Sequence, residues 1–469
     1  MKGRMKKRIL TSLFISALCG NTFASSNYSL STNLELPDVN AERTSNLSGD
    51  FGITSNQLVD DVGEVPGNYY WGEANIKYEK YTQSDQYWNI NFGTRVNDQE
   101  EMMISLREGY WQMRFQNSTL SAGRKILNWS HADKIWGLGK VNNRTNFDYF
   151  EPGQEGLTGI NFQQKFKNGF SYGAFISGLY VPELNPSSHY DESEGKVTCK
   201  NPWCKAPNET APVEGKDIPI FYNVNYPEPV DIAMRASAGL KIGQEFEVIN
   251  MSDLHAKLSV SGFYLRKPEN QIATTVEVKY QTDESRIFVD VTPQVFYHDV
   301  KGANIELDIQ EWNLKLYGST ISTVPEKRPD NEDPYIEYLG YRPKKLQEDY
   351  LSSGLIFNDG DFEAHLGYIA RVSDFDRENE LLAEYPRWNQ AVHLAAQKNL
   401  TRNVFVSLDY KYDMLTEDRL TMFNSSYRFG PSMVGSLGVN IIGTNPDEES
   451  FWSDFENNDA VYSSVKYTF

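Results

Sequence analysis

The chain ends in DAVYSSVKYTF, residues 459–469, and every second residue of this stretch shares one character. Reading back from Phe469, the series passes through Tyr467 and Val465 to Ser463 and Val461, and all but the serine are apolar. Alternation with a period of two is typical of a β-strand with one apolar face, whereas a free C-terminus is normally polar and frayed. The pattern predicts that the chain finishes in an ordered strand.

The first 24 residues, MKGRMKKRILTSLFISALCGNTFA, have the layout of a secretory signal peptide. Five basic residues precede an apolar core over residues 9–18, and Thr22–Ala24 offers a small-x-small cleavage site. The apolar core is about half of the ~20 residues that a transmembrane helix needs, and Leu18 is too bulky for a lipoprotein site at Cys19. We expect a signal peptide over 1–24, an N-terminal periplasmic leader over 25–44 and one domain over 45–469.

The 469-residue chain carries a formal net charge of −19, and loss of the basic signal makes the mature chain more acidic still. Binding to nucleic acid needs clustered Lys and Arg side chains that neutralise phosphates. The composition therefore predicts no nucleic-acid partner. It favours divalent cations and cationic or neutral solutes near the surface.

Period-two alternation continues through most of the chain, and no run of 18 apolar residues follows the signal peptide. It is clearest over residues 232–242, 287–297, 362–372 and 404–412. Such stretches run to about 10–14 residues, roughly twice the usual length of a globular strand, and this length suits a tilted membrane crossing. The sequence thus predicts an all-β fold built from transmembrane strands.

The connections between these stretches are sorted by length. Short turns are expected at 281–284, 357–361, 398–403 and 429–432, and long polar loops at 128–155, 182–229, 325–347, 374–387 and 443–458. Short periplasmic turns and long extracellular loops are typical of a transmembrane antiparallel β-barrel. A closed barrel also explains the ordered terminus, because its last strand must pair with its first.

Candidate strands give a count of about 20, with 18 as the nearest alternative; either size encloses a water-accessible lumen. They lie near 45–58, 69–82, 86–96, 101–116, 118–128, 156–166, 169–181, 230–243, 255–266, 272–282, 284–299, 303–310, 312–324, 348–358, 361–373, 388–398, 403–413, 419–429, 433–444 and 460–469. The terminal face of Val465, Tyr467 and Phe469 resembles the insertion signal of Gram-negative outer-membrane β-barrels. This resemblance implies an outer-membrane, porin-like barrel whose partners are the barrel insertion machinery, membrane lipid and lipopolysaccharide.

Residues 122–160 form the most unusual internal stretch, a Gly- and Trp-rich loop with many charges. Its candidates for a channel constriction are Arg124, Asp133, Lys140, Arg144 and Asp148. The Gly-Arg pair before a Trp-containing loop is similar to a pattern in alginate-export-type barrels, which implies passage of an anionic polysaccharide along a basic lumen. The tryptophans could instead belong to an aromatic girdle at the membrane surface.

The orientation of Arg124 stays open at this point. Strand alternation places it on the same face as Leu120 and Ile126, toward lipid, where a charge is costly. Either Gly123 marks a bulge that turns Arg124 toward the lumen, or the residue lies at the rim.

Two further loops have distinctive chemistry. Cys199 and Cys204, in an exported chain, predict a disulfide within a loop that forms an external cap or an inward-folded constriction. A zinc site would need further Cys or His ligands nearby, and the sequence offers none. The acidic stretch 445–459 could bind divalent cations that bridge lipopolysaccharide, or could simply be solvated.

No motif for catalysis is present: the sequence contains no HExxH, GxSxG or GxxxxGK[ST]. We therefore expect no enzyme activity, no catalytic residues, no cofactor and no metal site. The hypothesis is a channel or porin for passive or substrate-restricted passage of small hydrophilic solutes. Two alternatives stay open: a polysaccharide exporter, and a plugged barrel that binds partners at the cell surface.

Overall fold

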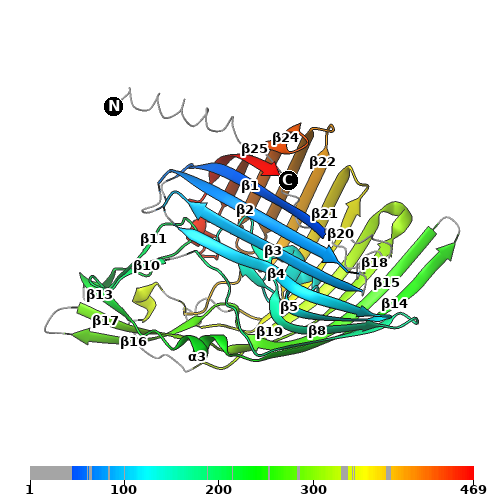
Figure 1. The fold of residues 1–469 in the computed structure, drawn as a ribbon. Helices are drawn as coiled ribbons and strands as arrows, with labels where there is room; N and C mark the ends of the chain where they lie inside the picture. Colours follow the sequence, from blue (N-terminus) through cyan, green and yellow to red (C-terminus); the bar gives the residue numbers. More distant parts are fainter. Residues whose placement is uncertain are drawn as a thin grey trace.

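The fold is given by a computed structural model (Figure 1), which describes residues 45–469 apart from short gaps. The gaps are 61, 63–65, 83–84, 100, 187, 214, 252–253, 282–285, 329–335, 341, 343 and 376–381. The predicted signal peptide and periplasmic leader, 1–44, lie outside the described residues. Within the described part, no helix has the length and apolar character to cross a membrane.

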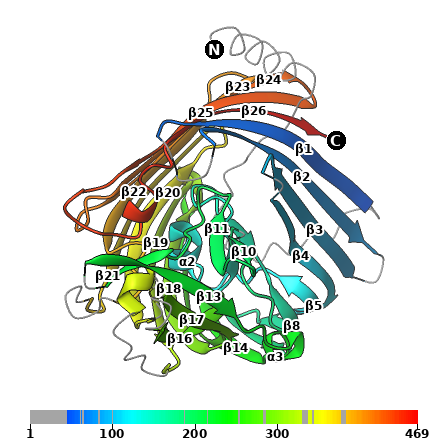
Figure 2. The same cartoon turned by 90° about the vertical axis from the view of Figure 1, so that its left-hand side faces the viewer.

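Eighteen antiparallel strands form one closed barrel, as Figures 1 and 2 show. In chain order they are β1 (Ser45–Leu58), β2 (Asn68–Tyr81), β3 (Gln86–Asn97), β4 (Met102–Phe115), β5 (Ser118–Lys125), β8 (Leu157–Lys165), β9 (Phe170–Ser177), β14 (Ser237–Met251), β15 (Leu254–Pro268), β18 (Tyr297–Ile309), β19 (Leu314–Pro325), β20 (Glu348–Asn358), β21 (Phe362–Arg371), β22 (Gln390–Asn399), β23 (Val404–Asp413), β24 (Arg419–Gly430), β25 (Met433–Gly443) and β26 (Ala460–Thr468). The terminal strand β26 pairs with β1 from Asp50↔Thr468 to Leu58↔Ala460, so the barrel has no open edge.

The alternation of the terminal strand separates the two faces of the wall. Val461 and Tyr467 are 52% and 45% exposed on the outside. Ser464 is buried and Lys466 lines the lumen. Phe469 is also exposed, and its ring stacks on that of Phe51 in β1 at 5.7 Å. An apolar outer face on a closed barrel suits hydrocarbon, and the chain is an outer-membrane β-barrel.

Most connections are sorted by length as the sequence predicts, although the extracellular connection 414–418 is short. Turns at 116–117, 166–169, 310–313, 359–361, 400–403 and 431–432 lie at one end, which is the periplasmic end. The strands are joined at the other, extracellular end by the segments 126–156, 178–236, 269–296, 326–347, 372–389 and 444–459, of which the structure describes all but the gaps given above. Both chain ends of the barrel, Ser45 and Phe469, are periplasmic, as an even number of strands requires.

Two predicted barrel strands belong instead to an extracellular sheet. The stretches expected at 272–282 and 284–299 form β16 (Ala273–Gln281) and β17 (Arg286–Gln294), and the strand expected at 303–310 is longer, as β18. β16 and β17 join β12 (Thr210–Val213) and β13 (Lys216–Val224) in a four-stranded sheet beyond the barrel wall (Figure 1). Its strands alternate like barrel strands because one face covers a small core that includes Ile220, Val276 and Val289. The strands on either side of the short turn expected at 281–284 belong to this extracellular sheet, so the prediction of a periplasmic turn there is wrong; residues 282–284 themselves lie outside the described residues.

Candidate functional site

The segment 126–156, between β5 and β8, folds into the lumen and carries the short helix α2 (His131–Trp136), seen inside the ring of strands in Figure 2. Ser130 begins the helix by accepting a hydrogen bond from the Asp133 N–H at 3.2 Å. Gly137 ends it in the left-handed conformation, with φ of 64°. Trp129 and Trp136 are almost fully buried in one apolar cluster with inward-facing wall residues. Their burial explains why the loop is rich in tryptophan, and they do not form a surface girdle.

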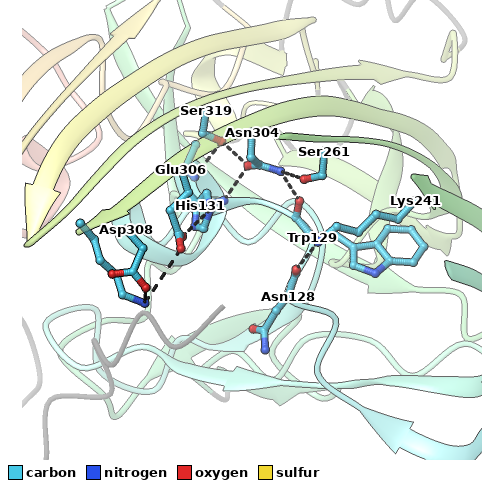
Figure 3. Close-up of polar contacts among 11 residues, drawn as sticks. Asn128, Trp129, His131, Lys241, Ser261, Asn304, Glu306, Asp308 and Ser319 are labelled. Atoms are coloured by element: carbon cyan, nitrogen blue, oxygen red, sulfur yellow. Dashed lines mark hydrogen bonds and ion pairs between the residues drawn. The ribbon is translucent and has the colours of Figure 1, made fainter. Parts of the chain in front are cut away.

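A row of small polar side chains on the inner wall holds this loop (Figure 3). Ser261, Asn304, Ser319 and Ser352 are direct partners across β15, β18, β19 and β20. The Asn304 amide accepts from the His131 N–H at 3.0 Å and donates to the Trp129 carbonyl at 2.7 Å. Ser319 accepts from the Ala132 N–H at 3.2 Å, and Ser352 accepts from the Trp136 indole at 2.9 Å. The row therefore fixes the backbone of α2 at one level of the barrel.

Charged side chains of the wall add to this attachment. Lys241 donates to the Asn128 carbonyl at 2.9 Å, and Glu306 lies 3.4 Å from the His131 imidazole (Figure 3). Apolar residues of further wall strands, among them Ile369 in β21 and Leu420 in β24, belong to the same buried cluster as the helix. The loop is thus a fixed internal partition.

Cavities lie on both sides of the partition. One of about 970 Å³ extends toward the periplasmic end, and one of about 550 Å³ opens among the extracellular loops. Four residues line both cavities: Gly137, Arg144, Tyr149 and Arg387. A further cavity of about 550 Å³ lies at the periplasmic end, between the β4–β5 and β8–β9 turns and neighbouring residues of β14 and β15. We call Gly137, Arg144, Tyr149 and Arg387, which line both of the first two cavities, the junction.

Two guanidinium groups are fixed at the junction by backbone carbonyls. Arg144 donates to the Asp133 carbonyl at 2.8 Å, at the end of α2. Arg387, from the extracellular segment before β22, donates to the carbonyls of Gly137 at 3.0 Å and Tyr149 at 3.1 Å. The Asp133 carbonyl also accepts from the Gly137 N–H that ends the helix, and a cation at this end of a helix is favourable. Arg387 also lies over the rings of Tyr149 and Trp452.

The larger cavity is lined by more basic than acidic side chains. Its basic residues are Lys77, Arg95, Arg107, Lys125, Lys134, Arg144, Arg387, Lys411 and Lys466. Its acidic residues are Asp50, Glu73, Glu108, Glu151, Glu363 and Asp409. The acidic composition of the whole chain therefore does not describe the lumen, where the excess is positive.

The five predicted constriction residues separate into two groups. Arg144 is at the junction, and Lys140 lines the extracellular cavity, where it pairs with Glu348. Arg124, Asp133 and Asp148 line none of the three cavities.

Arg124, Asp133 and Asp148, the second group, stabilise the inward-folded segment 126–156 through contacts away from the cavities. The buried Asp133 carboxylate accepts from the N–H groups of Lys140 at 2.5 Å and Val141 at 3.1 Å, which folds the turn after α2. Asp148 accepts from the Phe150 N–H at 2.8 Å. Burial and the nearby Glu151 raise the pKa of Asp148 to about 6.

Arg124 is buried inside the barrel and binds the end of the inward loop. It donates to Glu155 at 2.7 Å and to the Gly156 carbonyl at 2.9 Å. Gly123 before it has φ of 125°, and a side chain there would meet the Gly109 carbonyl. Only glycine tolerates this conformation, and it breaks the strict alternation that would have placed Arg124 toward lipid.

Sequence reasoning missed Arg387 and Tyr149, which complete the junction. Both lie in stretches identified as long loops, and nothing local distinguishes Arg387 from the other arginines of the extracellular segments. The final loop, expected to be solvated or to bind cations, also folds inward: Trp452 and Phe455 are buried in the lumen cluster. The predicted Cys199–Cys204 disulfide is confirmed. Across the described residues, no group of three or more His, Cys, Asp or Glu side chains could hold a metal.

No protein-family model and no curated protein matches the sequence. Solved structures of similar shape include Salmonella typhi OmpF in complex with daunomycin, with a TM-score of 0.44, 10% identity, and coverage of 91% of this chain and 98% of that one. Acinetobacter baumannii OccAB4 gives a TM-score of 0.44, 7% identity and coverage of 91% and 98%. Pseudomonas aeruginosa OccD3 gives a TM-score of 0.42 and 12% identity, with coverage of 91% of this chain and 90% of that one. These likenesses are too distant to bear on what this chain does.

Proposed function

We propose that the protein is an outer-membrane channel that lets small hydrophilic solutes pass by diffusion and catalyses no reaction. The observation that carries the proposal is the junction, at which the extracellular cavity and the larger lumen cavity share Gly137, Arg144, Tyr149 and Arg387. A fixed loop with polar side chains at its edge narrows the lumen between two wide vestibules. This arrangement selects solutes by size and charge.

The charge at the junction favours anions over cations of equal size. Its two charged members are both arginines, and the larger cavity has nine basic against six acidic side chains. Fixed charges act strongly in a narrow, low-dielectric passage, whereas acidic groups on the extracellular loops are screened by salt. The charges that line the lumen, and not the net charge of −19 of the whole chain, then set the preference for anions.

Planar-bilayer recording of the purified protein tests both statements. We expect stepwise conductance, and under a KCl gradient a reversal potential of the sign given by chloride preference. Conductance with potassium preference would overturn the charge argument alone. Silence of correctly folded protein would overturn the channel.

The alternative of a plugged, surface-binding barrel is favoured by one observation: Trp129, Trp136, Trp388 and Trp452 are buried in one apolar cluster with inward-facing wall residues. It predicts silence in the same recording. The polysaccharide-exporter alternative needs a continuous basic track. Glu73 interrupts that track, since it pairs with both Arg95 and Lys466.

We also propose how the chain is processed and inserted into the membrane. The signal peptide 1–24 is removed on export, the leader 25–44 stays in the periplasm, and residues 45–469 form the barrel. The insertion machinery reads the terminal face of Val465, Tyr467 and Phe469. Lipopolysaccharide surrounds the extracellular end.

A further inference from the structure

The loop closed by Cys199 and Cys204 reaches down from the extracellular segments to the junction. It follows β11 (Lys196–Cys199), and its Trp203 side chain is only 3% exposed. The indole packs edge-on against Tyr149, with ring centroids 5.5 Å apart, and against Phe150 at 5.2 Å. Tyr149 is a junction residue and Phe150 lines the larger cavity. An extracellular loop thus supplies the support behind one side of the passage.

Polar contacts hold the same loop from two sides. Asn201 is fully buried; its side-chain NH2 group donates to Glu101 at 3.0 Å, and its side-chain oxygen Oδ1 accepts from the Trp203 N–H at 2.9 Å. From the final loop, Asn458 donates to the Pro202 carbonyl at 2.8 Å. Buried polar groups with specific partners fix one orientation of a turn. The tryptophan is therefore held in place and does not merely rest on the aromatic cluster.

The disulfide restricts the turn that presents Trp203. Only four residues separate the two cysteines, and Trp203 directly precedes Cys204. A crosslink over so short a loop adds little to global stability, because it removes little entropy from the unfolded chain. Its effect is local, since it limits the conformations in which the indole can leave Tyr149.

We propose that Trp203 determines the size limit of the channel and that the Cys199–Cys204 disulfide keeps it in that position. Trp203 acts by positioning Tyr149, which itself borders the passage. This inference rests on the proposed channel function and adds to it the residue that sets solute size. Withdrawal of the indole lets Tyr149 move toward the space that Trp203 occupied, which widens the junction.

The test compares the full-length protein with W203A, W203F and C199S/C204S in planar bilayers, with neutral polyethylene glycols of graded size as probes. We expect W203A to conduct more than the wild type and to admit larger polymers. W203F, which keeps an aromatic ring, should stay close to the wild type. C199S/C204S, and the wild type treated with dithiothreitol from the extracellular side, should shift toward W203A. W312A, at an exposed periplasmic turn, is the control.

The outcomes separate the two proposals. If the wild type conducts and folded W203A has the same conductance and polymer limit, this inference is wrong and the channel stands. If W203A widens the channel while the cysteine variant and dithiothreitol have no effect, the role of the disulfide is wrong. If no variant conducts, the channel proposal fails and this inference fails with it. Heat-dependent mobility on gels shows whether each variant is folded.

Discussion

Asn304 and Ser319 face each other across β18 and β19, and both bind the start of helix α2. The Ser319 hydroxyl donates to the side-chain oxygen Oδ1 of Asn304 at 2.8 Å, and that oxygen also accepts from the His131 N–H at 3.0 Å. Ser319 in turn accepts from the Ala132 N–H. The barrel wall therefore provides ready-made partners for N–H groups that a helix leaves unsatisfied at its beginning. The position of the partition follows from the register of two strands.

Replacement of Asn304 by alanine should loosen the partition. The change leaves the His131 N–H and the Trp129 carbonyl buried without their partner, at a cost of about 1–3 kcal/mol per group. We expect a noisier channel current and faster proteolysis within 126–156, with the barrel still heat-modifiable.

Ser353→Ala is the matched control, because Ser353 follows Ser352 in β20 but faces outward. Quiet, wild-type current from Asn304→Ala would show that packing of Trp129 and Trp136 alone fixes the loop.

Replacement of Arg387 by glutamine should reduce anion preference. The variant removes one of two junction guanidinium groups and the hydrogen bonds to Gly137 and Tyr149. We expect the reversal potential in a KCl gradient to move toward potassium. Arg402→Gln, an equal loss of charge at an exposed periplasmic turn, should leave it unchanged. An equal shift in both variants would mean that overall charge, and not the junction, determines selectivity.

The sequence predicts the barrel well because each membrane strand must face lipid on one side and the lumen on the other. Period-two alternation reports this two-sided environment, but it does not report which sheet a strand joins. The strands that contain Val276 and Val289 cover a core on one face just as barrel strands do, so the alternation wrongly predicts them to be barrel strands. Only the observed pairing of β15 with β18 separates the two sheets.

The site is less accessible from the sequence, because it depends on contacts between distant segments. Arg144 is within the Trp-rich loop and could be predicted, whereas Arg387 reaches the junction only through the folding of a separate loop. Arg124 shows a second limit: the positive φ of Gly123 breaks the alternation, and the sequence does not reveal whether a glycine adopts that conformation. Asp133 looks like a lumen charge, but the backbone N–H groups of Lys140 and Val141 use its carboxylate.

The pKa of Asp148, raised to about 6, predicts a pH-dependent stability of the inward loop. A raised pKa means that the folded state holds the proton more tightly than the unfolded state. Its stabilising contribution is present at low pH and is lost as the pH rises through about 6.

Asp148→Asn should therefore raise the free energy of unfolding at pH 7.5 by about 1–3 kcal/mol, and the unfolding temperature with it. At pH 4 the same substitution should give no gain. Asparagine keeps an oxygen that can accept from the Phe150 N–H. Heat-dependent gel mobility across pH measures this. A gain of equal size at both values would contradict the assignment to Asp148.

Replacement of Phe469 by serine should impair assembly without altering the channel. The ring lies on the outer face at the β1–β26 seam, where it stacks on Phe51, and Phe469 lines neither cavity. We expect several-fold less folded protein in the outer membrane, measured by the heat-modifiable band, while the molecules that do insert keep wild-type conductance. Phe429→Ser provides the control, since Phe429 is also an exposed aromatic near the periplasmic end but lies within the chain. A general loss of membrane-facing apolar area would lower the yield of both variants equally, whereas recognition of the terminal face lowers that of Phe469→Ser alone.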